Sequence, residues 1–214
     1  MTYTVLALDA PRSAIGVATA SRALAVGASV PGLDPQVGAV ASQAWTNQLL
    51  RGRVLGAVRD GDSPAAALDR LESWDDEVEL RQTGVLGIDG RGSAYTGRAI
   101  RAWRGDFVDD GVVALGNVLT GPEVLGAVRE ALASFAPAGV DSLATALVGA
   151  LAAGEAAGGD SRGRQSAAIL VAEVGAEVLD YDLRVDDAAD PVAELGRLVD
   201  LRAQVRATVS TPRR

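Results

Sequence analysis

Apolar runs separated by turn residues open the chain, a pattern that is typical of β-strands. Positions 2–9 and 14–21 form two such runs, and the turn residues Ala-Pro-Arg-Ser between them predict a hairpin. A loop rich in glycine and proline over 27–35 leads to a third strand over 37–44. Further strands are predicted over 82–88, 93–96 and 112–119. The pattern therefore predicts that strands make up much of the chain before position 120.

Helical periodicity occurs in two pairs of segments. A helix over 47–59 is followed directly by a second helix, which Ser63 caps and Pro64 begins, because the first turn does not use the amide proton that proline lacks. The second pair starts where Thr120 and Glu123 have the spacing of a capping box. Its apolar positions recur at helical period, at Leu125, Val128, Leu132 and Phe135 and then at Leu143, Leu147 and Leu151.

The C-terminal part contains two strands and a last helix. A glycine-rich loop over 158–164 precedes strands predicted at 165–174 and 177–182. A helix is predicted over 190–208, and residues 209–214 are expected to form a disordered tail.

Strands and helix pairs are thus segregated along the chain, which does not fit strict βαβ alternation. Such an order favours helix layers over the outer faces of antiparallel sheets. We therefore predict an α+β fold, a four-layer αββα sandwich of two largely antiparallel sheets. Because the composition shows no break or linker, residues 1–214 are expected to form a single domain.

Composition removes several classes of catalytic site. The chain contains no histidine and no cysteine, and every basic side chain is arginine. These absences exclude a Ser-His-Asp triad, a thiol nucleophile, a disulfide, a histidine or thiolate zinc site and lysine Schiff-base chemistry. A catalyst must use a hydroxyl, carboxylates, arginine or the terminal amine, whose ordinary pKa of about 8 suits a base. Carboxylate-bound magnesium or calcium stays open, although no segment resembles an EF-hand loop, and we expect no cofactor or metal.

Charge and hydropathy indicate which partners the chain meets. The net charge of −8 disfavours nucleic acid, because a phosphate backbone is bound by a basic face. The N-terminus lacks the basic and long apolar regions of a signal peptide, and the apolar stretch over 143–157 is short enough for a buried helix. We expect a cytoplasmic protein with a small-molecule substrate and without a membrane partner.

Thr2 and Asn117 are the candidates for catalytic residues. The small size of Thr2 permits removal of Met1, and a terminal threonine joins a hydroxyl nucleophile and an amine base in one residue. Many cytoplasmic proteins begin Met-Thr without a catalytic role, so the signal has low specificity. Asn117, in an otherwise apolar strand, is either an amide donor to a developing oxyanion or part of a strand-end turn.

Polar residues near strand ends are candidates for substrate binding. In the segment over 160–166, glycine allows a ligand to approach the backbone and Arg164 could anchor a carboxylate, whereas a solvated turn with Asp160 paired to an arginine fits equally well. Polar groups at the other strand ends, including Trp45 and Asn47, are either ligand contacts or structural hydrogen-bonding partners. The candidate substrate-binding residues are Ser21, Arg22, Gln43, Asp160, Arg164 and Ser166.

Five segments form an ordered set of motifs that begin at residues 2, 20, 38, 116 and 158. They read Thr-Tyr-Thr-Val-Leu-Ala, Ala-Ser-Arg-Ala-Leu-Ala-Val-Gly-Ala, Gly-Ala-Val-Ala-Ser-Gln-Ala-Trp, Gly-Asn-Val-Leu-Thr-Gly-Pro-Glu-Val and Gly-Gly-Asp-Ser-Arg-Gly-Arg-Gln-Ser-Ala-Ala. In this order they resemble an uncharacterised bacterial family related to N-terminal-nucleophile (Ntn) hydrolases, the domain of unknown function 1028. The resemblance spans about residues 2–201 and implies the αββα fold and an amidohydrolase site of unknown substrate.

The resemblance places Thr2 at the nucleophile position, at the start of the first strand. Ser21 and Arg22 match the Ser-Arg that ends the second strand in proteasome-like relatives. The chain departs from those relatives at Ala20, where they have aspartate, and in lacking the lysine that helps to activate their threonine. Activation then falls to the terminal amine, assisted by Arg22 or Asp160.

Two functions compete on this basis. The first is hydrolysis of an amide or related C–N bond in a small, anionic substrate by Thr2, through an acyl-enzyme intermediate. The second is a non-catalytic protein that binds a small ligand on the same scaffold, which Ala20 and the missing lysine favour. A purely structural oligomer is a third interpretation, and homo-oligomerisation is compatible with all three.

Overall fold

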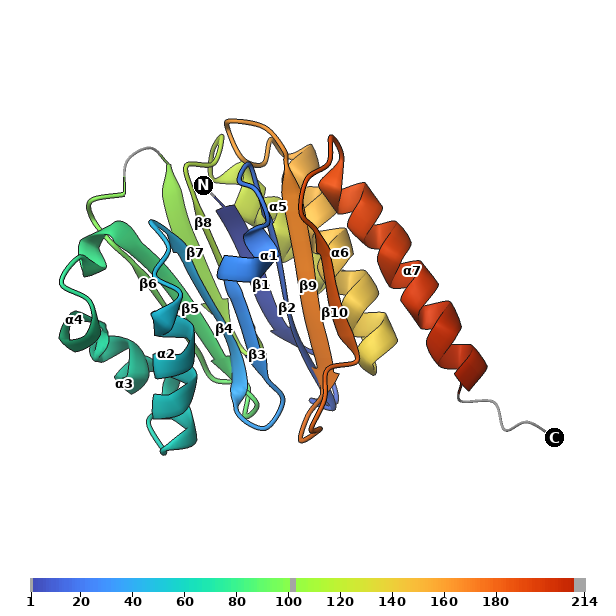
Figure 1. Ribbon diagram of the computed structural model, residues 1–214, viewed down its shortest axis with the longest axis horizontal. Coiled ribbons are helices and arrows are strands. Elements are labelled where there is room, and N and C mark those ends of the chain that lie inside the picture. Colours follow the sequence, from blue (N-terminus) through green and yellow to red (C-terminus); the bar gives the residue numbers. More distant parts are fainter. Residues whose placement is uncertain (1, 101–102, 210–214) are drawn as a thin grey trace.

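The computed structural model describes residues 2–100 and 103–209, and these residues form two β-sheets with helices on both outer faces (Figure 1). One sheet has six strands in the order β10-β9-β2-β1-β8-β7, and the other has four in the order β3-β4-β5-β6. All neighbouring strands of both sheets are antiparallel. The strands are β1 Thr2–Leu8, β2 Ala14–Ser21, β3 Pro31–Asp34, β4 Gly38–Ala44, β5 Arg81–Gly87, β6 Gly92–Thr96, β7 Arg104–Asp109, β8 Val112–Asn117, β9 Ser166–Glu173 and β10 Tyr181–Val185. The predicted α+β sandwich is confirmed.

The helices form the two outer layers (Figure 1). Helices α2 to α4 cover the four-stranded sheet, and α5 to α7 cover the six-stranded sheet. The bounds are α1 Val26–Ser29, α2 Leu49–Arg59, α3 Pro64–Asp69, α4 Leu71–Trp74, the 3-10 helix η1 Val78–Leu80, α5 Glu123–Ala133, α6 Val140–Ala156 and α7 Pro191–Val209. The Ser63 hydroxyl accepts a hydrogen bond from the Ala66 amide (3.2 Å), so the predicted cap of α3 is confirmed. Within the described residues, no helix combines the length and apolarity that spanning a bilayer requires.

Strand β1 shows why the central strands are mostly apolar in sequence. Its side chains alternate between two cores, because successive residues of a strand point to opposite faces. Tyr3 and Val5 pack against the layer of α5 and α6, whereas Leu6 packs between the two sheets, near Leu86 and Leu115. Both faces are buried, so most positions are apolar, and the two threonines that face the second sheet, Thr2 and Thr4, form side-chain hydrogen bonds.

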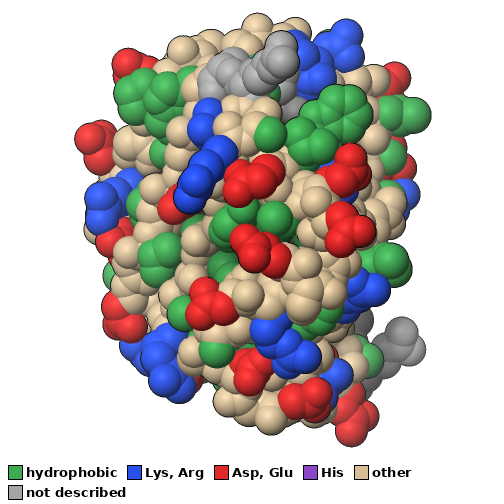
Figure 2. All heavy atoms as spheres, turned by 90° about the vertical axis from the view of Figure 1, so that its left-hand side faces the viewer, with side chains coloured by type: hydrophobic (Ala, Val, Ile, Leu, Met, Phe, Trp, Pro, Cys, Tyr) green, Lys and Arg blue, Asp and Glu red, His purple; other side chains and the backbone are tan. Residues whose placement is uncertain are grey.

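The face of the molecule that includes α3 and α4 carries acidic, basic and hydrophobic side chains (Figure 2). Arg70, between α3 and α4, forms an exposed ion pair with Asp62 (3.0 Å). Exposed pairs of this kind contribute little to stability, so the cores determine the fold.

The edge strands β3 and β7 were not predicted. The loop predicted over 27–35 contains α1 and the edge strand β3, in which Pro31 takes the first position, where a missing amide proton is tolerated. No strand was predicted over 104–109, where β7 forms one edge of the six-stranded sheet with its side chains half exposed. An edge strand buries little apolar surface, so its sequence pattern is weak.

The ends of other elements also differ from the prediction. Strand β10 begins at Tyr181 instead of residue 177, because the buried Tyr181 ring joins the helix-side core while Val178 is exposed. The expected capping box of α5 is absent, since Pro122 precedes the helix and gives no side-chain cap. Phe135 lies beyond the end of α5 and is exposed. The last helix extends to residue 209, and residues 210–214 lie outside the described part of the chain.

Candidate functional site

Thr2 is the first residue of β1, between β2 and β8 in the centre of the larger sheet. Its hydroxyl lies 3.1 Å from the Ser21 hydroxyl, and its register partner on β8 is Asn117. Alternation along the strand places Thr2 and Thr4 on the face toward the second sheet, opposite to Tyr3. The predicted candidates Thr2, Ser21 and Asn117 are therefore brought together. Met1 lies outside the described residues.

A cleft of about 710 Å³ opens beside Thr2. Thr2 lies where the chain begins, at one end of the sandwich (Figure 1). The volume of the cleft lies within the range of about 300–1,000 Å³ that is typical of small-molecule sites. The wall is mostly apolar, and among its polar residues Asn117 is the register partner of Thr2. The lining residues are Thr2, Ala23, Val26, Ser29, Val30, Ala44, Trp45, Thr46, Leu80, Ala99, Ile100, Asn117, Val118 and Arg162.

A chain of buried amides supports the floor of this cleft. Gln43 Nε2 donates to the Thr2 carbonyl (3.2 Å) and to Gln82 Oε1 (2.8 Å), and Gln43 Oε1 accepts from Thr4 Oγ1 (2.6 Å). Gln82 Nε2 donates to the Gly116 carbonyl (3.0 Å). Gln43 was expected to contact a ligand, but it is fully buried and holds the backbone of Thr2 in place instead.

The same network fixes the orientation of Asn117. Its Nδ2 donates to Gln82 Oε1 (3.0 Å), because the Gln82 amide is itself oriented by backbone carbonyls. Its Oδ1 is buried and has no hydrogen-bond partner among the described residues. Asn117 therefore retains one N–H and one unpaired oxygen beside Thr2, and a buried polar atom in this state favours a ligand or water that pairs with it.

The glycine-rich loop before β9 is organised by Asp160. The carboxylate accepts hydrogen bonds from the backbone amides of Arg22 (2.8 Å) and Arg162 (2.9 Å), and it pairs with the Arg162 guanidinium (3.2 Å). Asp160 is nearly buried, whereas the Arg162 side chain is 47% exposed and lines the cleft. The loop thus binds the end of β2 through Asp160 and places Arg162 in the lining of the cleft.

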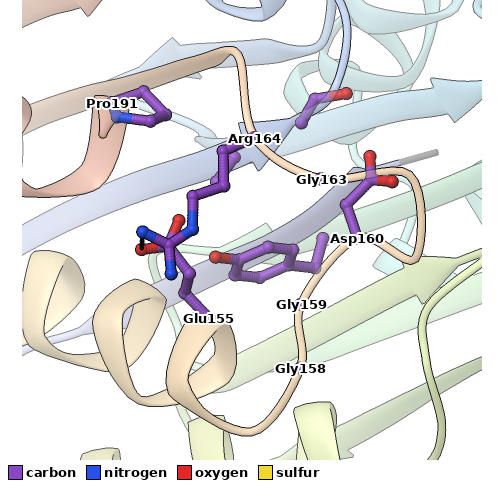
Figure 3. Close-up of a pocket in the computed structure, with 10 residues that line it drawn as sticks. Glu155, Gly158, Gly159, Asp160, Gly163, Arg164 and Pro191 are labelled. Atoms are coloured by element: carbon purple, nitrogen blue, oxygen red, sulfur yellow. Dashed lines mark ion pairs between the residues drawn. The ribbon is translucent and has the colours of Figure 1, made fainter. Parts of the chain in front are cut away.

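Arg164, the predicted anchor, lies on the other face of the sheet (Figure 3). It turns toward Glu155 (3.4 Å) and Asp190 (3.6 Å), beside a pocket of only about 80 Å³. Burial raises the pKa of Glu155, and the positive charge of Arg164 opposes that rise. Gly163, between the two arginines, has a φ of +112°, and Arg162 lines the cleft in place of the predicted anchor Arg164.

Two other predicted contacts lie beside the cleft and do not line it. The Ser166 hydroxyl donates to the Ala23 carbonyl (2.5 Å) and accepts from the Val26 amide (3.1 Å), so it fixes the segment before α1. The Arg22 guanidinium donates to Gln165 (2.7 Å) on the exposed side of the loop. Both side chains are used in structural contacts.

The family model that matches the chain is described as a family of unknown function, DUF1028, and it covers residues 2–195. The chain belongs to the DUF1028 family. It is similar to the crystal structure of protein SPO2555 from Silicibacter pomeroyi, a DUF1028 protein, with 30% identity and a TM-score of 0.82 over 99% of this chain and 90% of that chain. Anbu, the ancestral β-subunit from Yersinia bercovieri, gives 8% identity and a TM-score of 0.46 over 99% of both chains. A search of curated proteins found no match.

Unusual backbone conformations surround the cleft of this DUF1028 protein. Among the described residues, four that are not glycine have positive φ, and three of them, Ala25 (53°), Ala44 (72°) and Val118 (51°), line the cleft or adjoin it. This conformation costs about 1–3 kcal/mol and is most costly for a β-branched residue such as valine. Strain of this kind gathers at functional sites, and no sequence pattern indicates it.

The contacts that hold Trp45 in the DUF1028 chain were not predictable from the sequence. The Arg81 guanidinium donates to the Trp45 carbonyl (2.8 Å) and binds both carboxylate oxygens of Asp75 (2.8 and 3.2 Å). Asp75 also accepts from Asn47 Nδ2 (2.7 Å). Chiefly through the bonds from Arg81, the pKa of Asp75 falls to about 2. Asn47 is thus a structural hydrogen-bonding partner, which was one of its two interpretations from the sequence; the other was a ligand contact.

The acidic residues of the DUF1028 protein are dispersed. Within the described part of the chain, no three of them gather closely enough to hold a metal ion. The described side chains that line the cleft offer a ligand hydroxyls, an amide, one guanidinium and apolar groups.

Proposed function

We propose that this protein is an Ntn-type amidohydrolase in which Thr2 becomes the terminal residue after removal of Met1. It would cleave an amide or related C–N bond of a small molecule. The observation that carries the proposal is the position of the Thr2 hydroxyl, at the start of a central strand, bonded to Ser21 and open to a cleft of small-molecule size. A terminal threonine needs no histidine, which this chain lacks.

In this mechanism the Thr2 hydroxyl oxygen attacks the carbonyl carbon, and its proton passes to the α-amino group. The C–N bond then breaks as the departing amine takes that proton, and an acyl ester remains on Thr2. A water molecule, deprotonated by the α-amino group, hydrolyses the ester and restores the hydroxyl. Ser21 orients the nucleophile, and the remaining N–H of Asn117 donates to the oxyanion.

The charge at the site decides which anionic substrates are compatible with it. Among the described residues of the lining, Arg162 is the charged one, and Asp160 offsets much of its charge. We therefore propose a substrate with at most one carboxylate, which would pair with the exposed side of Arg162. Arg164 is engaged elsewhere and has no role in this proposal.

The test is the intact mass of the full-length protein before and after incubation with a β-lactone that acylates terminal hydroxyl nucleophiles. The proposal predicts loss of one methionine and one adduct on Thr2. Thr2→Ala should abolish the adduct, whereas Ser29→Ala, which removes another hydroxyl of the cleft lining, should retain it. A retained Met1, or a free Thr2 that never reacts, would overturn the proposal.

A non-catalytic binding protein is the second candidate. It is favoured by Ala20, where proteasome-like relatives have aspartate, and by the absence of lysine. This candidate predicts ligands that raise the thermal midpoint of unfolding and are recovered unchanged after long incubation. Consumption of such a ligand by the unmodified chain, and its survival with Thr2→Ala, would exclude this function.

A further inference from the structure

We infer that the cleft selects substrates with an apolar acyl group, either aromatic or a medium-length alkyl chain. This inference rests on the proposed function and adds the class of substrate. Its first basis is the wall of the cleft, in which apolar side chains from distant parts of the chain converge. They are Val26, Val30, Trp45, Leu80, Ile100 and Val118.

The apolar wall is built in depth. Val26 and Val30 are 2% exposed and Ile100 is 5% exposed, so the inner wall is part of the packed protein. Trp45 is 70% exposed at the rim, where its ring can cover an incoming group. Large exposed aromatic side chains beside a cavity favour contact with an apolar partner.

The segment that carries the inner wall is held in place before any ligand arrives. The Ser166 hydroxyl bridges the backbone on both sides of Ala25, and the Ala25 amide donates to the Asp186 carbonyl (2.9 Å). Because the wall is preformed, little conformational entropy is lost on binding, and the contacts with the ligand contribute more of their free energy to the affinity.

Charge in the cleft supports the same class. The guanidinium of Arg162 is the one charged group of the lining among the described residues, and it pairs with the nearly buried Asp160. A phosphorylated or dicarboxylic acyl group would find a single, largely compensated positive charge and would lose its hydration against valine and isoleucine. The wall therefore matches a neutral acyl group.

The order of bond breaking assigns the apolar wall to the acyl side. The amine leaves first and must reach solvent, whereas the acyl group remains bound to Thr2 until water hydrolyses the ester. The exposed rim near Trp45 and Arg162 provides the exit. The buried wall then holds the part that stays.

The experiment measures kcat/KM of the full-length protein for N-acyl p-nitroanilides that differ in the acyl group. Each methylene that enters the apolar wall should raise kcat/KM about three- to fourfold, up to the size of the cleft. Hexanoyl and phenylacetyl substrates should therefore exceed acetyl by at least about tenfold, and they should exceed succinyl as well. Equal rates, or a preference for succinyl, would overturn the inference.

Two variants and a matched control locate the preference. Val26→Thr keeps the shape of valine and replaces one methyl group by a hydroxyl, so it should reduce the ratio of hexanoyl to acetyl rates severalfold. Trp45→Ala should reduce it too, without touching the buried wall. Val178→Thr makes the same chemical change at a position that is 74% exposed and away from the cleft lining, and it should leave the ratio unchanged.

Binding to Thr2→Ala separates this inference from the proposed function. Calorimetric titration of that variant with acetamide, hexanamide and succinamate requires no catalysis. Tighter binding of hexanamide than of acetamide supports the apolar wall even if the unmodified protein hydrolyses no substrate. Missing hydrolysis would refute only the proposed hydrolase function. Hexanamide that binds no better than acetamide would refute the apolar wall, whatever the chain catalyses.

Discussion

Replacing Asp75 by asparagine removes the carboxylate that holds the Trp45 side of the cleft. Asp75 Oδ2 accepts hydrogen bonds from Arg81 Nε (2.8 Å) and Asn47 Nδ2 (2.7 Å), and Oδ1 accepts from Arg81 Nη2 (3.2 Å) and the Glu77 amide (3.0 Å). Asparagine has one acceptor oxygen, so an amide group would face donors. The Arg81 guanidinium would keep its hydrogen bonds to the Trp45 carbonyl and to Glu77 but would lose the carboxylate of Asp75.

The size of the effect follows from the pKa of Asp75, which falls from an ordinary value of 3.8 to about 2. At about 1.4 kcal/mol for each tenfold change in ionisation, this shift corresponds to about 2 kcal/mol of folding free energy at pH 7. Because the pKa is lower in the folded state, the contribution is complete well above pH 3.8 and is lost as the pH falls toward 2. We expect it to fall by about half at pH 3.

Urea unfolding followed by tryptophan fluorescence measures this prediction. Asp75→Asn should lower the free energy of unfolding by about 2–3 kcal/mol at pH 7 and pH 5, and by clearly less at pH 3. Asp110→Asn is the matched control, because the Asp110 side chain is 81% exposed in its pair with Arg12, and it should change stability by less than about 0.5 kcal/mol. Equal effects of both variants, or an Asp75→Asn effect that does not change with pH, would refute the reasoning.

Three further changes test packing and hydrogen bonding, each by thermal or urea unfolding. Asp9→Ala leaves three backbone amides and a serine hydroxyl without their acceptor and should lower the free energy of unfolding by about 2–3 kcal/mol. Burial opposes ionisation of Asp9, but these hydrogen bonds hold its pKa below the ordinary value. The loss of stability should therefore be smaller in acid. Gly154→Ala would place a methyl group 2.9 Å from Val128 and should destabilise α6 by about 1–3 kcal/mol, whereas Gly149→Ala in the same helix meets open space and should stabilise it by up to about 1 kcal/mol. Ser166→Ala should cost about 1–3 kcal/mol, because two backbone groups lose their partner; an unchanged stability would contradict its structural role.

Much of the fold could be predicted because the central strands and helices carry their pattern locally. Residues 2–9 and 14–21 are mostly apolar, since both faces of β1 and β2 are buried. The edges could not be predicted in the same way. In β3 and β7 the pairing of the backbone, rather than an apolar face, makes the strand, and pairing depends on a neighbour that is distant in sequence.

The candidate site was predictable in part for a similar reason. Thr2, Ser21 and Asn117 are polar residues at the ends of apolar strands, which the sequence displays directly. The roles of Gln43 and Ser166 were not visible, because a buried amide or hydroxyl is assigned by the partners that it meets. Those partners come from strands and loops far along the chain.

By itself, the sequence determined the class of fold, the chemical groups available for catalysis and the family. Apolar periodicity and missing residue types are properties of the chain that folding does not change. The tertiary structure decided which arginine lines the cleft, because Arg162 pairs with Asp160 beside it while Arg164 pairs with Glu155. It also decided that the cleft is apolar, since its wall is assembled from segments that meet only when the two sheets pack together.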